Sequence, residues 1–200
     1  MFNKKVNLFF ALVIFSIFIF SGCGLQKSAD KVVEEYCITL LKNGKIYDKM
    51  LDNFNSQNKN KKDITLTSSQ IRNLAVACVE KMKKFNIQTK IITSEKAITS
   101  DSDEAKVEVT VEYINLDVLG KDNIFQDELQ KRVKDVYDIE ERKSIAIDTV
   151  IDYIPEIPVE GTRSFIVDCD YDKKQKKWVL KYPDTVTNIL ISTMMQGARL

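Results

Sequence analysis

The side chains best able to do covalent chemistry in this chain are its four cysteines, Cys23, Cys37, Cys78 and Cys169. No two of them are spaced as Cys-x-x-Cys, so their spacing predicts neither a redox pair nor a metal site. The sequence has no histidine, which removes the commonest general base and the commonest zinc and copper ligand. We therefore expect no metal, no cofactor and no imidazole-based catalytic triad.

Cys23 directly follows a segment typical of an export signal. Lys4 and Lys5 precede the apolar run Leu8–Phe20, and the small residues Ser21 and Gly22 follow it. Its thirteen residues suit a signal peptide better than a helix crossing about 30 Å of hydrocarbon. The segment 1–22 is therefore predicted to be a signal peptide.

The four residues Phe20, Ser21, Gly22 and Cys23 resemble the lipobox of bacterial prolipoproteins, in which the first position is usually leucine. The resemblance implies that Cys23 carries diacylglycerol and becomes the acylated N-terminal residue. Two acyl chains give stable anchoring, whereas one holds only marginally. The implied location is the extracytoplasmic face of the cell membrane. The alternative is an uncleaved signal anchor in which Cys23 is a bystander thiol.

Residues 23–29 are predicted to form a lipidated linker. Residues 30–200 are predicted to form a single α+β domain. The sequence has 30 Lys and Arg against 29 Asp and Glu, so net charge suggests no nucleic-acid partner.

Apolar periodicity predicts helices in the first half of the domain, over residues 29–41, 46–54 and about 68–85. Asn43-Gly44 is expected to end the first helix, and Thr67 with Gln70 to form a capping box that opens the third. The polar residues 55–63 between them are predicted to be a loop. Its lysines Lys59, Lys61 and Lys62 would either contact anionic headgroups or remain solvated.

The second half alternates with a period of two, which predicts strands over residues 87–95, 106–115, 161–171 and 177–182. A long helix capped by Asn123 is expected over residues 124–154, with a break, bend or projection where Glu140 to Lys143 interrupt its apolar stripe. A short helix over 184–195 would close the chain. The predicted fold class is α+β, with helices packed on one face of a curved antiparallel sheet and a long helix between two hairpins.

One face of this sheet is the predicted ligand pocket. Its residues are Val109, Val111, Tyr113, Phe165, Val167 and Trp178. They would either line an open cavity or simply fill the core. Asp168 and Asp170 share a strand face and would be carboxylates for catalysis if they faced inward, or ordinary surface groups on the wet side.

The remaining cysteines allow two interpretations. Cys37 and Cys78 fall on apolar helix faces and would form a disulfide in an oxidising compartment, or all three thiols would be small buried hydrophobes. Similarly, Asp101, Asp103 and Glu104 would be calcium ligands or a plain acidic turn. The turn is favoured because the glycine and the distal glutamate of a calcium loop are missing.

The segment Tyr36 to Leu51, YCITLLKNGKIYDKML, resembles the opening of nuclear-transport-factor-two-like domains, which have a cystatin-like α+β fold. Together with the lipobox it is similar to uncharacterised lipoproteins of Gram-positive bacteria. The resemblance implies a cone that holds a small ligand, a catalytic site or only packed side chains, and it carries no catalytic residue onto this chain.

The sequence therefore predicts a lipid-anchored binding module for a small ligand or an envelope partner. The alternatives are a carboxylate- or lysine-based enzyme in the same cone and a purely structural envelope protein. The lack of a catalytic motif speaks against an enzyme.

Overall fold

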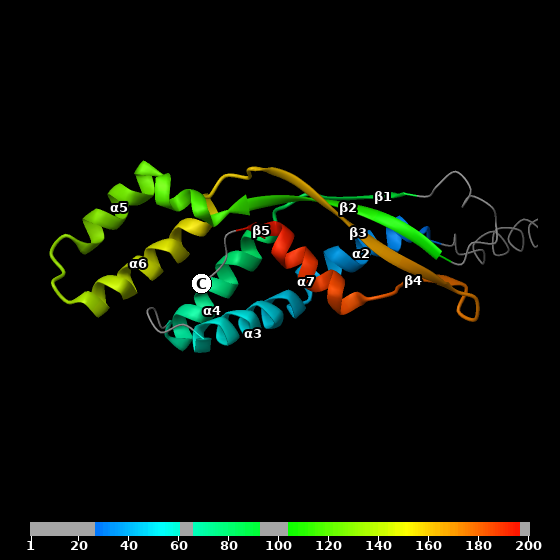
Figure 1. Cartoon of the computed structure of the whole chain (residues 1–200), viewed down its shortest axis with the longest axis horizontal. Coiled ribbons are helices and arrows are strands. Elements are labelled where there is room, and N and C mark those ends of the chain that lie inside the picture. Colours follow the sequence, from blue (N-terminus) through cyan, green and yellow to red (C-terminus); the bar gives the residue numbers. More distant parts are fainter. Residues whose placement is uncertain (1–26, 61–65, 93–103, 197–200) are drawn as a thin grey trace, which may run out of the picture.

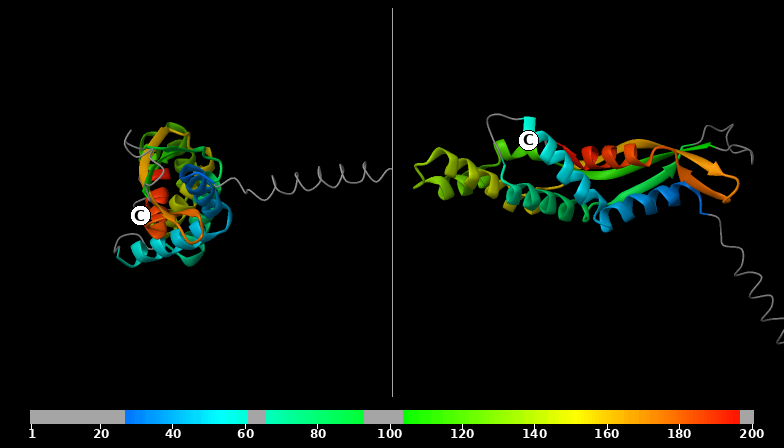
Figure 2. Two further views of the ribbon diagram at one scale, coloured as in Figure 1. Left: turned by 90° about the vertical axis from the view of Figure 1, so that its right-hand side faces the viewer. Right: turned by 90° about the horizontal axis from the view of Figure 1, so that it is seen from below.

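The computed structural model describes residues 27–60, 66–92 and 104–196 (Figure 1). Helices pack on one face of an antiparallel sheet, which confirms the predicted α+β class. The domain is elongated, with the strand β4 (Lys177–Leu180) near one end and the helices α5 (Asn123–Val133) and α6 (Ile139–Tyr153) at the other (Figures 1 and 2).

The sheet has four antiparallel strands in the order β1-β2-β3-β4. Their bounds are Ile87–Ile91, Glu104–Asn115, Gly161–Asp172 and Lys177–Leu180. A short fifth strand, β5 (Met195–Gln196), pairs in parallel with Ile114 and Asn115 of β2. The sequence predicted the four long strands but not β5, because two residues carry no alternating pattern.

Alternation along β2 separates a buried face from a polar one. Val107, Val109 and Val111 are 0% exposed, whereas Lys106 points to solvent. The helices α2 (Ala29–Lys42) and α7 (Pro183–Met194) lie against this sheet. Their buried side chains and the strand valines belong to one hydrophobic core, so helices and sheet stabilise each other.

The end of α2 confirms the predicted stop. Asn43 is the C-terminal cap, and Gly44 has φ +74°, a conformation that glycine adopts without steric cost.

The next helix, α3 (Lys45–Asn60), is longer than predicted, because residues 55–60 are helical rather than a loop. Asn58 explains part of this difference, since its side chain accepts a hydrogen bond from the Leu66 amide at 2.8 Å and donates one to the Leu66 carbonyl at 3.0 Å. Lys59 therefore lies in the last turn of a helix, while Lys61 and Lys62 lie outside the described residues.

The helix α4 (Ser68–Met82) begins with the predicted capping box. The Thr67 hydroxyl accepts from the Gln70 amide at 3.2 Å, and the Gln70 side-chain oxygen accepts from the Thr67 amide at 3.1 Å. The Gln70 side-chain nitrogen also donates to the Ser144 hydroxyl and to the Asp148 carboxylate. This buried amide therefore caps α4 and joins it to α6.

The predicted long helix is two helices, α5 (Asn123–Val133) and α6 (Ile139–Tyr153), which follow the 3-10 turn Leu116–Lys121. A break was predicted, but it lies before Glu140, not across residues 140–143. Asp138 caps α6 by accepting from the Glu141 amide, and acidic side chains in a first turn favour helix initiation. The N-terminal cap of α5 is Asp122 and not the predicted Asn123.

The helices α5 and α6 run side by side as a projecting hairpin (Figure 1). The Arg132 guanidinium contacts the Asp152 carboxylate at 2.7 Å, and the rings of Phe125 and Tyr153 lie 5.4 Å apart. A short 3-10 turn, Ile154–Glu156, then leads to β3.

The terminal helix α7 confirms the predicted helix after Pro183. Leu190 and Met194 are fully buried in the core. Among the described helices, none combines the length and apolar character needed to cross a membrane.

Candidate ligand-binding groove

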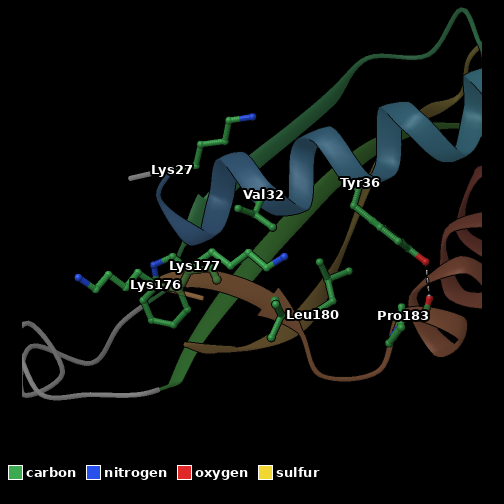
Figure 3. A pocket seen from close by; sticks show the side chains of 9 residues that line it. Lys27, Val32, Tyr36, Lys176, Lys177, Leu180 and Pro183 are labelled. Carbon is green, nitrogen blue, oxygen red and sulfur yellow. Dashed lines mark hydrogen bonds between the residues drawn. The ribbon is translucent and has the colours of Figure 1, made fainter. Parts of the chain in front are cut away.

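A groove of about 520 Å³ runs between the first turns of α2 and the strand β4 (Figure 3). We call it the basic groove. Its lining residues are Lys27, Val32, Tyr36, Lys176, Lys177, Trp178, Val179, Leu180 and Pro183. The walls are mostly apolar, and the charged groups are all lysines, so the groove suits a ligand with an apolar body and a negative charge.

The helix wall is set by the spacing of Val32 and Tyr36, which lie one helical turn apart on the same face of α2. The Tyr36 hydroxyl donates to the Pro183 carbonyl at 3.0 Å and lies 3.1 Å from the Thr187 hydroxyl. These contacts tie α2 to the start of α7 and close one end of the groove, as the dashed line in Figure 3 shows.

The strand wall is set by Trp178 and Leu180, which alternate onto the same side of β4. Trp178 is half-buried and meets the ring of Tyr171 edge to face, with 5.3 Å between ring centroids. This contact holds the indole against the neighbouring strand β3 while part of it stays available to the groove.

The β3–β4 turn places lysines at the open end of the groove. One oxygen of the Asp172 carboxylate accepts from the backbone amides of Lys174 and Gln175, at 2.9 and 3.0 Å. Lys176 has φ +51°, which turns the chain sharply into β4. Across the groove, the Lys27 ammonium is paired with the Glu35 carboxylate at 2.7 Å, so the net positive charge at this end comes from Lys176 and Lys177. The groove therefore has a basic end and an apolar end.

The structure places the six predicted pocket residues in different surroundings. Val109, Val111 and Val167 are buried in the core beneath the helices, and Phe165 is partly buried against the same core. The ring of Tyr113 lies 4.5 Å below the Arg163 guanidinium.

Of the six, Trp178 alone lines the basic groove. The helix wall was missed because Val32 and Tyr36 are distant in sequence from β4. No local pattern reports which helix a strand will face.

The acidic pair considered for catalysis lies on the outer face of the sheet. Asp168 is exposed, and Asp170 lies 3.6 Å from the Lys181 ammonium, with 41% of its side chain accessible to solvent. The interpretation of these carboxylates as surface groups is therefore confirmed.

A lysine-based catalyst needs a lowered pKa, and Lys81 has one. Burial lowers the pKa of Lys81, but its ammonium donates to the Pro155 carbonyl at 2.9 Å and serves a packing contact.

The three described cysteines, Cys37, Cys78 and Cys169, are buried and free, which contradicts the disulfide and confirms their interpretation as small hydrophobes. Burial raises the pKa of Cys37 and Cys78 to about 12 and that of Cys169 to about 11. Because the thiolate is the reactive form, these thiols are chemically inert in the folded protein.

The burial of these three cysteines predicts how many thiols react with a reagent before and after unfolding. A thiol reagent at pH 8 should label almost nothing in the folded mature protein, because on the order of one thiol in 10⁴ is ionised at a pKa of 12. Unfolding in denaturant should expose Cys37, Cys78 and Cys169 together. Labelling of a fourth thiol would show that Cys23 is unmodified, and rapid labelling of the folded protein would contradict the buried placement.

No cluster of three or more acidic or cysteine side chains suited to a metal occurs in the described ranges. Asp101 and Asp103 of the predicted turn lie outside those ranges. The Glu104 carboxylate accepts from the Lys181 ammonium at 3.3 Å.

No known family description matches this sequence, and no curated protein matches it either. Its fold is similar to the crystal structure of ycdA, a candidate lipoprotein from Bacillus subtilis, with a TM-score of 0.49 and 19% sequence identity. The match covers 64% of this chain and 38% of that one, so this chain corresponds to less than half of the Bacillus protein.

Proposed function

We propose that this protein is an extracytoplasmic lipoprotein, anchored through Cys23, whose basic groove binds an amphipathic anion. The observation that carries the proposal is the groove itself, in which apolar walls lead from lysines at one end to Tyr36 and Pro183 at the other. The sequence predicted a small ligand or an envelope partner. Of these we propose the small ligand, a molecule with an acyl-like body and a carboxylate or phosphate group.

The anchor would keep the groove close to such ligands. Lys27 follows Cys23 by four residues, and four extended residues span at most about 14 Å. Lys27 lines the basic end, so a lipidated Cys23 would hold that end within reach of the headgroup region. Fatty acids and lipid phosphates are concentrated in that region.

The volume and chemistry of the groove match this ligand class. About 520 Å³ lies within the range of roughly 300–1,000 Å³ found for small-molecule sites. Val32, Trp178 and Leu180 offer apolar contact, while Lys176 and Lys177 offer ammonium groups that bind a carboxylate or phosphate as point charges.

Trp178 is the only tryptophan in the chain, so its fluorescence reports on the groove without a label. Titration with a long-chain fatty acid should shift the emission to the blue in a saturable manner. Its methyl ester should bind about tenfold more weakly, because it lacks the charge that the lysines contact.

Val32→Asp should weaken fatty-acid binding at least tenfold, because it places a negative charge in the apolar wall. Val76→Asp is the matched control, since Val76 is exposed on α4 and lies outside the groove. An emission spectrum that does not respond, or equal binding of acid and ester, would overturn the proposed ligand class.

One observation favours the alternative of a structural envelope protein. At the tip of the α5–α6 hairpin, Tyr137 is 92% exposed and Ile139 is 67% exposed. Exposed apolar groups of this kind mark protein contacts. A photo-crosslinking residue at position 137 should then join a defined envelope protein in intact cells, while one at position 131 should not.

A further inference from the structure

The tip of the β3–β4 hairpin concentrates positive charge. Between Asp172 and Lys177 the chain has lysines at positions 173, 174, 176 and 177 and a single carboxylate. That carboxylate accepts from backbone amides in the turn. The whole chain is almost electrically balanced, so the basic tip is a local feature and not a result of composition.

The basic tip lies at the end of the domain where α2 begins. Lys27, Lys176 and Lys177 line the same groove, which places the tip beside the residue four positions after Cys23. Figure 1 shows the start of α2 and the β3–β4 turn at one end of the elongated domain, with the α5–α6 hairpin at the other.

We infer that the basic tip docks on an anionic phospholipid surface and that the α5–α6 hairpin then points away from the membrane. This inference rests on the lipid anchor of the proposed function and adds an orientation to it. Each lysine held near an anionic surface favours the docked state roughly fivefold. The lipid anchor by itself specifies attachment to the membrane and no orientation of the domain.

In the described part of the chain, two acidic groups of the neighbouring strands pair with Lys181 and not with Lys174, Lys176 or Lys177. Glu104 and Asp170 lie along the strands, where both contact the Lys181 ammonium, at 3.3 and 3.6 Å. Lys59, considered for headgroup contact on sequence grounds, lies in the last turn of α3, and this end of α3 lies away from the start of α2 (Figure 1).

The test uses the mature lipoprotein in vesicles of phosphatidylcholine with about one part in three phosphatidylglycerol. A nitroxide on the lipid headgroups should quench Trp178, which neighbours the tip. Quenching should be weak in pure phosphatidylcholine and should fall at high salt, because about 1 M salt shortens the screening length to about 3 Å.

Lys176→Gln with Lys177→Gln should lower the ratio of docked to undocked protein about 25-fold, the product of two fivefold effects. The matched control is Lys131→Gln with Lys134→Gln, which removes the same charge around the end of α5 and should change nothing. Equal quenching in both vesicle types, or equal effects of the two double variants, would overturn the docking.

Flotation with the vesicles separates the two proposals. Protein that floats without quenching has its anchor but does not dock, which overturns the inference alone. Protein that does not float lacks the anchor, and the inference then fails together with the proposed location.

Discussion

Cys23→Ala is expected to leave the signal peptide attached and to remove the mass of about two acyl chains from the protein. The reason is chemical, because the sulfur of Cys23 would carry the diacylglycerol and cleavage would make its amino group the new N-terminus. Each buried CH₂ contributes about 0.8 kcal/mol to membrane binding, so the loss of two chains removes the anchor of the mature form. Intact mass and membrane fractionation in the native host measure both effects.

Cys37→Ala is the matched control for this experiment. It makes the same substitution at a buried cysteine of α2 and should leave processing and acylation unchanged. If the wild type keeps its leader and behaves like Cys23→Ala, the chain is signal-anchored. The lipoprotein location and the orientation inferred from it would then be wrong.

Val109→Asp is expected to prevent the domain from folding. Val109 is fully buried in the second strand of the sheet, with β1 on one side and β3 on the other. A carboxyl group there has to be desolvated without a partner, at an expected cost above about 4 kcal/mol. That cost approaches the lower end of the roughly 5–15 kcal/mol that stabilises a typical domain. Circular dichroism should show no cooperative thermal transition.

Ile166→Asp is the control for this prediction. Ile166 is an exposed apolar residue of β3, opposite Glu108 on the outer face of the sheet. The new carboxylate stays in water, so the melting temperature should fall by only a few degrees, mainly through repulsion from Glu108. A Val109→Asp variant that melts like the wild type would contradict the assignment of Val109 to the core.

Local patterns predicted much of the fold. Three features depend on only a few neighbouring residues each, and all three were confirmed. They are the alternation of β2, the glycine after α2 and the capping box of α4. The extension of α3 was not predictable in this way, since it depends on a bond from Asn58 to Leu66 in another segment. The nuclear-transport-factor-two-like assignment stays a prediction.

The basic groove illustrates why a site is harder to predict than a fold. Its two walls come from α2 and β4, and a hydrogen bond from Tyr36 to the Pro183 carbonyl joins α2 to the start of α7, which follows β4. The sequence indicated an aromatic residue at position 178 and an amphipathic helix near position 36. It did not indicate that they face each other, because that depends on how α2 and α7 settle on the sheet.

The pairing of β5 with β2 has a consequence for biogenesis. Met195 lies beside Ile114, and Leu190 and Met194 of the preceding helix complete the core. The core therefore closes only after α7 and β5 have been made, because β2 must wait for partners that lie far downstream of it in the chain. A chain stalled before α7 would leave exposed the part of the sheet that α7 covers in the complete domain.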